Sequence, residues 1–85
     1  MALKMEKLNY AVSMLNHKLG MALEMYTDNK INSGHFYIEQ AYGGFKLVRI
    51  SNGDYGSVSD ISSRGSKREV YDFIKGILLG MELAK

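Results

Sequence analysis

The first part of the chain carries apolar side chains at intervals of three and four residues. This spacing is formed by Leu8, Ala11, Val12, Leu15 and Leu19. It places these side chains in a single stripe and predicts an α-helix over residues 3–19. We expect the helix to stop at Gly20, because a glycine after Lys18 and Leu19 suits a left-handed cap with a cation in the last turn. Ala22 and Tyr26 would continue the stripe, so a helix that runs to about Tyr26 is the alternative.

The centre of the chain alternates between turn formers and β-rich runs. Residues 27–34, TDNKINSG, are dense in turn formers and predict a loop. In the run HFYIEQAYGGFKLVRI, the Gly43-Gly44 pair predicts a β-hairpin. The Asn52-Gly53 pair is favoured in tight turns and introduces a third run, SVSDIS. Two turns between three β-rich runs predict a three-stranded antiparallel meander.

The last helix is predicted to begin at Ser66. Ser66 and Glu69 have the spacing of a capping box, in which each side chain bonds the backbone N–H of the other residue. The apolar side chains that follow at helical spacing are Val70, Phe73, Ile74, Ile77, Leu78 and Met81. The element order is therefore α-β-β-β-α. It predicts an α+β fold in which the three-stranded meander packs against two helices.

Both helical segments also carry apolar side chains away from the main stripe. They are Tyr10, Met14 and Met21 in the first segment and Tyr71, Leu79 and Leu83 in the last. A helix that is apolar on more than one side is usually buried on more than one side. The second contact is either another copy of the chain, most simply in a two-fold homodimer, or a wide core face over the sheet.

Composition narrows the classes of function. The 85 residues predict one domain over 1–85, and the lack of cysteine excludes disulfides and thiolate metal sites. Eleven lysines and arginines against nine acidic residues give a net charge of +2, too small an excess to indicate nucleic acid by itself. No apolar run approaches the ~18 residues of a membrane-spanning helix, and the N-terminus lacks a signal-peptide core. We expect a cytoplasmic protein without a membrane partner.

The residue types that support catalysis or metal binding do not occur in suitable patterns. His17 and His35 show no HxH or HExxH spacing; we expect His17 to be exposed and His35 to be a surface or hydrogen-bonding residue. No serine between residues 57 and 66 lies in a GxSxG elbow. Asp54 and Asp60 fit turn and strand-edge positions better than an acid/base pair. We therefore expect no catalytic residue, no metal and no cofactor, and a protein that is not an enzyme.

The segment that leads into the last helix gives the strongest indication of binding. Arg64, Lys67 and Arg68 lie around a helix start, where a cation is unfavourable by ~0.3–1 kcal/mol because unpaired N–H groups make that end positive. An anion held jointly by these N–H groups and the cations would offset the cost. The alternative is a solvated first turn in which Glu69 and Asp72 compensate the cations.

The AYGG motif extends the predicted site. Its two glycines either let the backbone approach a ligand closely or only make a turn, and aromatic side chains flank them. The candidate ligand-binding residues are Tyr42, Gly43, Gly44, Phe45, Arg64, Ser66, Lys67 and Arg68. In this site Arg64 and Arg68 would make forked contacts to phosphate or carboxylate, and Tyr42 or Phe45 would stack. Only the fold can decide whether the AYGG turn and Arg64 are adjacent.

Four short motifs resemble a group of small uncharacterised proteins encoded by phages and prophages. They are the AYGG-x-x-L hairpin at 41–47, the Asn-Gly turn at 52–53, the V-x-D-I strand at 58–61 and the K-R-E-V-Y helix start at 67–71. The resemblance implies an accessory protein that inhibits a host factor or sequesters a small signalling nucleotide. The element order and the GSKRE segment more weakly resemble double-stranded RNA-binding domains. That resemblance implies phosphate contacts by Lys67 and Arg68, with His35 a weaker match.

Two classes of function follow from these patterns. The first is a non-enzymatic phage- or prophage-type binding protein, with a homodimer as its expected assembly. Its ligand would be anionic, either a nucleotide or the acidic face of a host protein. The alternative is an RNA- or DNA-binding module that contacts phosphates through Lys46, Arg49, Lys67 and Arg68. A structural dimer without a ligand is a third possibility.

Overall fold

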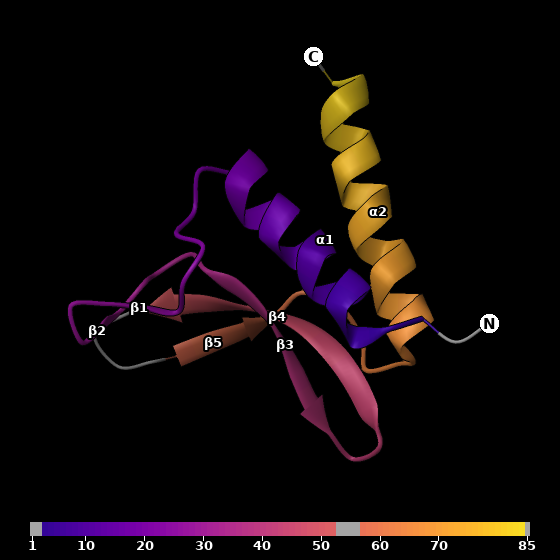
Figure 1. The fold of residues 1–85 in the computed structure, drawn as a ribbon, viewed down its shortest axis with the longest axis horizontal. Coiled ribbons are helices and arrows are strands. Elements are labelled where there is room, and N and C mark those ends of the chain that lie inside the picture. The colour runs from indigo at the N-terminus through magenta and orange to yellow at the C-terminus, as the bar shows by residue number, and fades with distance from the viewer. Residues whose placement is uncertain (1–2, 53–56, 85) are drawn as a thin grey trace.

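Two helices from opposite ends of the chain pack against each other beside a three-stranded sheet (Figure 1). The computed structural model describes residues 3–52 and 57–84. Its elements are α1 (Met5–Lys18), β1 (Tyr26–Thr27), β2 (Lys30–Ile31), β3 (Phe36–Ala41), β4 (Gly44–Asn52), β5 (Ser57–Asp60) and α2 (Lys67–Leu83). The predicted α+β fold, with an antiparallel meander packed against two helices, is confirmed. The short β1–β2 hairpin lies in a segment that was predicted only as a loop.

The main sheet has the order β3-β4-β5, and both of its strand pairs are antiparallel. Ala41 pairs with Gly44, so the turn of the β3–β4 hairpin consists of Tyr42 and Gly43, with φ values of 53° and 73°. The prediction of a turn centred on Gly43-Gly44 was therefore wrong by one residue. The predicted Asn52-Gly53 turn cannot be compared in the same way, because Gly53 lies outside the described residues.

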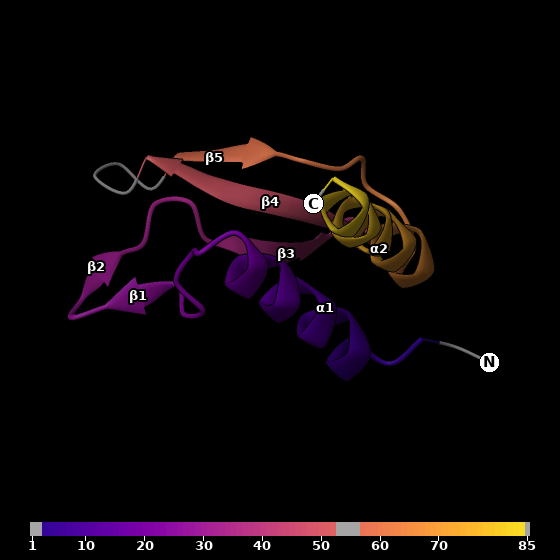
Figure 2. The ribbon, with the colours of Figure 1, turned by 90° about the horizontal axis from the view of Figure 1, so that it is seen from above.

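The helices cover one face of the sheet. The buried apolar side chains of this core are Leu8, Ala11, Val12, Leu15, Phe36, Leu47, Val70 and Ile74. Helix α1 lies against β3 and α2 lies against β4. Within residues 3–52 and 57–84, neither helix approaches β5, which lies on the far side of β4 from α1 (Figure 2). The helix layer is therefore narrower than the sheet.

Helix α1 ends before Gly20, as predicted. The N–H of Gly20 donates to the carbonyl of His17, and the N–H of Met21 donates to the carbonyl of Asn16. These are the two hydrogen bonds of a Schellman motif, which satisfies carbonyls at the end of a helix. The alternative of a helix that continues to Tyr26 is wrong. Leu19 is 40% exposed because it follows the last helical turn, so its predicted place in the buried stripe is also wrong.

Helix α2 begins with the predicted capping box. The N–H of Glu69 donates to Ser66 Oγ at 3.1 Å, and the N–H of Ser66 donates to Glu69 Oε1 at 3.0 Å. Its buried face is narrower than expected, because Phe73 is 42% exposed and only Val70 and Ile74 are buried. The remaining predicted core residues, Ile77, Leu78 and Met81, are partly buried. These three residues lie in the second half of α2, which extends beyond α1 and the sheet (Figure 1).

Two buried polar side chains connect the start of β3 to α1 and to the segment that follows α1. The Asn16 side chain accepts a hydrogen bond from the N–H of Phe36 at 2.8 Å and donates one to its carbonyl at 3.0 Å. His35 is buried, and its Nδ1 lies 2.8 Å from the carbonyl oxygen of Ala22. His35 is therefore the hydrogen-bonding residue of the two predicted alternatives, and His17 is exposed as predicted.

Candidate functional site

The fold brings the β3–β4 turn next to the segment that precedes α2. Phe45 and Gly65 form an isolated antiparallel bridge, in which each N–H donates to the other residue's carbonyl at 2.8 Å. This bridge lays the Arg64 side chain across the hairpin. A β-carbon at Gly44 would lie 2.8 Å from Arg64 Cγ, so this close approach requires glycine. The AYGG turn and Arg64 are therefore adjacent.

Arg64 is held by the hairpin that it crosses. Its Nη1 donates to the carbonyl oxygen of Ala41 at 3.0 Å, and its Nη2 lies 2.8 Å from Glu39 Oε1. The guanidinium also lies 5.4 Å from the centroid of the Tyr42 ring. A carboxylate, a carbonyl and an aromatic ring of the chain itself thus surround this arginine, which ties the hairpin tip to the segment before α2.

Neighbouring charges continue this pairing across the sheet. Glu39 stands opposite Lys46 in the β3–β4 register, and Lys46 Nζ lies 3.0 Å from Asp60 Oδ1 on β5. Positive and negative side chains therefore alternate from Arg64 to Asp60. Opposite charges on neighbouring strands stabilise a sheet and leave little net charge for a ligand.

The start of α2 is occupied by a carboxylate of the chain itself. The backbone N–H of Ser66 and then its hydroxyl hold the pKa of Glu69 below its ordinary value by hydrogen bonding to the carboxylate. Arg68 Nε lies 3.5 Å from Asp72 Oδ1, one helical turn further along. Lys67 Nζ lies 5.8 Å from the Phe45 ring centroid, and it has no ion pair with any described residue. This geometry matches the alternative in which Glu69 and Asp72 compensate the cations.

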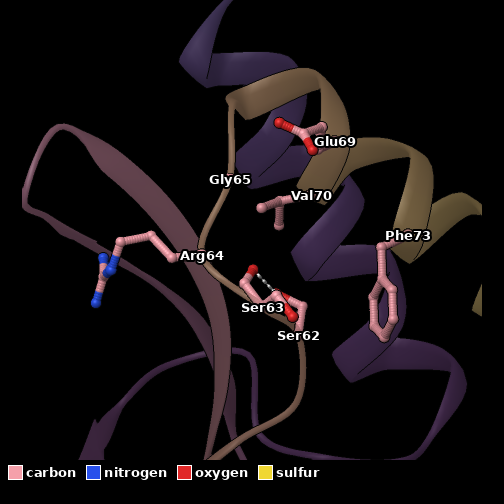
Figure 3. Close-up of a pocket in the computed structure, with 7 residues that line it drawn as sticks. All are labelled: Ser62, Ser63, Arg64, Gly65, Glu69, Val70 and Phe73. Carbon is pink, nitrogen blue, oxygen red and sulfur yellow. Dashed lines mark hydrogen bonds between the residues drawn. The ribbon is translucent and has the colours of Figure 1, made fainter.

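A groove of about 220 Å³ lies between the first turns of α2 and the segment before it. Its lining residues are Ser62, Ser63, Arg64, Gly65, Glu69, Val70 and Phe73 (Figure 3). Figure 3 shows the Arg64 side chain pointing away from α2 toward the hairpin, with its charged end far from Glu69 and Phe73. The charged group nearest to the helix start is therefore a carboxylate, which does not favour a small anion in this groove.

The predicted site residues divide into two groups. The fold gathers the turn residues Tyr42, Gly43, Gly44 and Phe45 with Arg64, Ser66 and Lys67. Arg68 lies apart from them, because its guanidinium turns toward Asp72 and lies 5.9 Å from the Tyr71 ring centroid. Phe45 packs against the core, whereas Tyr42 is 95% exposed. Tyr42 is therefore the aromatic residue that the site presents to solvent.

The four cations predicted to contact nucleic acid do not share one surface. Lys46 and Arg49 are three residues apart on β4, so their side chains point to opposite faces of the sheet. Lys46 pairs with Asp60, while Arg49 lies 5.0 Å from the centroid of the Phe36 ring on the helix-covered face. This arrangement gives the nucleic-acid alternative no continuous track of cations.

Two features of possible functional importance were not predicted. The left-handed backbone of Tyr42 was missed because the turn was placed one residue later; the pairing of Ala41 with Gly44 determines it. A second groove, which opens beside Arg49, forms between segments distant in sequence, and no local motif indicates it.

Among the described residues, no three His, Asp or Glu side chains gather as metal ligands. The described helices include none that is long and apolar enough to cross a membrane.

Comparison of the chain with family models, with curated protein sequences and with solved structures finds no match. The resemblance to phage and prophage proteins and the topological resemblance to double-stranded RNA-binding domains therefore remain predictions. The function has to be argued from the geometry of the residues.

Proposed function

We propose that the chain is a non-enzymatic accessory protein of the phage or prophage type. It acts in the cytoplasm by binding a partner protein through the tip of the β3–β4 hairpin. The observation that carries this proposal is the state of Tyr42, whose side chain is 95% exposed and whose φ is 53°.

The backbone conformation of Tyr42 is unfavourable for its residue type. Positive φ is uncommon outside glycine, and two-residue turns with positive φ at both positions favour Asn-Gly. Tyrosine at this position costs about 1 kcal/mol, and its exposed ring recovers none of that by burial in the core. Strained backbone positions cluster at functional sites, which supports a binding role for the ring.

The neighbourhood of Tyr42 favours a protein partner over a nucleotide. Tyrosine and arginine are enriched among the residues that dominate binding energy in protein interfaces, and Arg64 lies against the Tyr42 ring. A phosphate would need free cationic donors, but Arg64 is held by Glu39 and the α2 start by Glu69. Lys67 is the cation of this site without a carboxylate partner among the described residues. The partner that best matches these residues is a protein whose surface has a recess for the Tyr42 ring and an acidic group beside Lys67.

The substitution Tyr42→Asn tests this proposal. It creates an Asn-Gly turn, so we expect the free energy of unfolding to rise by a few tenths to about 1 kcal/mol. The same change should remove the partner that wild-type protein captures from a lysate of the organism that encodes the chain. Captured proteins would be compared by quantitative mass spectrometry.

The matched control is Tyr10→Ala, because Tyr10 is a tyrosine that is 67% exposed and belongs to α1 rather than to the hairpin. This variant should capture the same partner as the wild type. Equal recovery of the same proteins by the wild type and by Tyr42→Asn would contradict binding through the hairpin tip.

We further propose that the chain forms a homodimer through the outer face of α2. Phe73, Leu79 and Leu83 are 42%, 59% and 76% exposed on this helix. A β-carbon at Gly76 or Gly80 would meet nothing within 4 Å, so no described part of the chain requires glycine there. Each glycine costs ~1 kcal/mol relative to alanine inside a helix.

The pattern on this face suits an antiparallel copy of the same helix. Phe73, Gly76, Gly80 and Leu83 lie on one side of α2, symmetrically about Leu78 in the sequence. A two-fold axis that crosses this face at the level of Leu78, whose own side chain packs on the core, would therefore place Phe73 on the partner's Leu83 and the two glycines opposite each other. Two-fold interfaces are self-complementary in this way.

The oligomeric state of Gly80→Leu tests the dimer. We expect wild-type protein to sediment as a dimer at about 100 µM, a concentration at which weak micromolar association is populated. Gly80→Leu should sediment as a folded monomer, because a bulky side chain blocks close helix approach while helix propensity rises. A wild type that is monomeric at this concentration, or a dimeric variant, would contradict the proposal.

A further inference from the structure

The guanidinium of Arg49 is oriented by its neighbours but has no anionic partner among the described residues. It lies 5.0 Å from the Phe36 ring centroid, and its Nε donates to the carbonyl oxygen of Gly34 at 3.3 Å. Its Nη2 lies 3.7 Å from the sulfur of Met21. These contacts hold the guanidinium in place on the helix-covered face of β4. Within residues 3–52 and 57–84, no acceptor takes the N–H groups of Nη1.

The other two arginines of the chain show how unusual this is. Arg64 and Arg68 each have a carboxylate oxygen within 3.5 Å. Arg49 is partly buried, yet no described carboxylate lies within ion-pairing distance of it. Withdrawing a charged group from water is unfavourable unless it is paired and hydrogen-bonded. A ligand that supplied an anionic group would complete this site.

A groove of about 530 Å³ opens beside this guanidinium. The residues that line it include Met21, Gly34, Arg49, Ser59 and Ile61. Ser59 is the register partner of Arg49 on β5, so its hydroxyl lies on the same face of the sheet. Met21 and Ile61 supply apolar surface. The groove exists because the helices stop short of β5, as Figure 2 shows from above.

We propose that this groove binds a small organic anion, namely a carboxylate or phosphomonoester with a short apolar chain. The charged group accepts hydrogen bonds from the free N–H groups of Arg49, since a guanidinium matches the geometry of both anions. The apolar chain lies against Met21 and Ile61. A volume of about 530 Å³ is in the usual range for small-molecule sites.

This site is distinct from the hairpin tip. Arg49 pairs with Phe36 near the base of the β3–β4 hairpin, whereas Tyr42 forms its turn. Arg49 is also on the opposite sheet face from Glu39, the carboxylate that binds Arg64. Binding in the groove therefore does not depend on the proposed protein partner.

Nuclear magnetic resonance titration of the full chain with four probes tests the proposal. The probes are hexanoate, hexyl phosphate, inorganic phosphate and hexanol. We expect hexanoate and hexyl phosphate to shift the Arg49 Nε–H signal and the Gly34 and Ser59 amide signals in a saturable way. Hexanol, which lacks the charge, and inorganic phosphate, which lacks the chain, should each bind at least tenfold more weakly. Inorganic phosphate that binds as tightly as hexyl phosphate would overturn the assignment of an organic anion.

Two variants and a control locate the binding. Arg49→Gln should weaken both organic anions at least tenfold, whereas Arg64→Gln, the control that removes a paired arginine, should leave their affinities unchanged. Ser59→Leu fills the groove from an exposed strand position and should abolish binding while it retains the charge of Arg49. This second variant decides the question if Arg49→Gln fails to fold. Failure of every probe to give saturable shifts, or wild-type affinity in Ser59→Leu, would overturn the proposal.

Discussion

The two regions at opposite ends of the β3–β4 hairpin use an arginine differently. At the tip, Arg64 contacts a carboxylate, a backbone carbonyl and a tyrosine ring. At the base, Arg49 contacts a phenylalanine ring, a carbonyl and a sulfur, and no described carboxylate pairs with it. The first arginine completes contacts within the chain, whereas the second has hydrogen-bond donors left over beside a groove.

This difference shows that a cation in a sequence motif is not by itself a ligand site. Arg64 was expected to bind an anion because it lies near a glycine turn and a helix start. The fold instead supplies its anion, Glu39, from the neighbouring strand. Arg49 lies in an ordinary strand pattern, and the sequence indicated it only as one of four cations that could contact nucleic acid. Its availability depends on which carboxylates the fold brings near it.

We expect the largest effect on stability at the hairpin tip. Arg64→Ala removes two charge-assisted hydrogen bonds and leaves the partly buried Glu39 unpaired, so we expect a loss of about 1–2 kcal/mol. Arg49→Ala removes weaker contacts and should cost less than about 1 kcal/mol. Urea unfolding of the two variants and the wild type measures both. A loss at Arg49 that equals or exceeds the loss at Arg64 would contradict the view that Arg64 is the arginine with stabilising contacts inside the chain.

A smaller effect, the pH dependence of the melting temperature, tests whether the Glu69 carboxylate acts as the anion at the start of α2. Hydrogen bonds from Ser66 lower the pKa of Glu69 in the folded chain relative to its ordinary value of 4.5. A depressed folded-state pKa contributes stability above the unfolded-state value, and that contribution disappears as pH falls through the folded-state value. Wild-type protein should therefore have a higher melting temperature than Glu69→Gln at pH 7, and the difference should shrink by pH 3. A difference that stays the same at both pH values would show that the charge of Glu69 does not matter.

Local patterns predicted the elements whose causes lie within a few residues. The α1 stripe, the end of α1 before Gly20 and the Ser66–Glu69 capping box follow from helical spacing and short-range hydrogen bonds. The three β-rich runs form the expected meander, because turn formers separate them. These features depend on backbone geometry that neighbouring residues define.

Predictions failed where a neighbouring element decides burial or pairing. Phe73 fits the apolar stripe of α2 but is 42% exposed, and it lines the open groove between the first turns of α2 and the segment before it. Asn16 and His35 are buried because their hydrogen-bond partners come from other segments. No local pattern predicted the burial of Asn16, and His35 was expected to be either a surface or a hydrogen-bonding residue. The turn at Tyr42 and Gly43 reflects the register of two whole strands rather than the glycine pair alone.

Sequence patterns alone were enough to predict the two terminal helices, the three-stranded meander, the end of α1, the start of α2 and the residue types available for binding, but not the β1–β2 hairpin. Only the tertiary structure decided how those residues are used. It pairs Arg64 with Glu39, leaves Tyr42 exposed at the hairpin tip and leaves Arg49 in a groove without a described carboxylate partner. The physical reason is that helix and turn signals act over three or four residues. Charge pairing and burial instead depend on segments that meet only after the sheet and helices have packed.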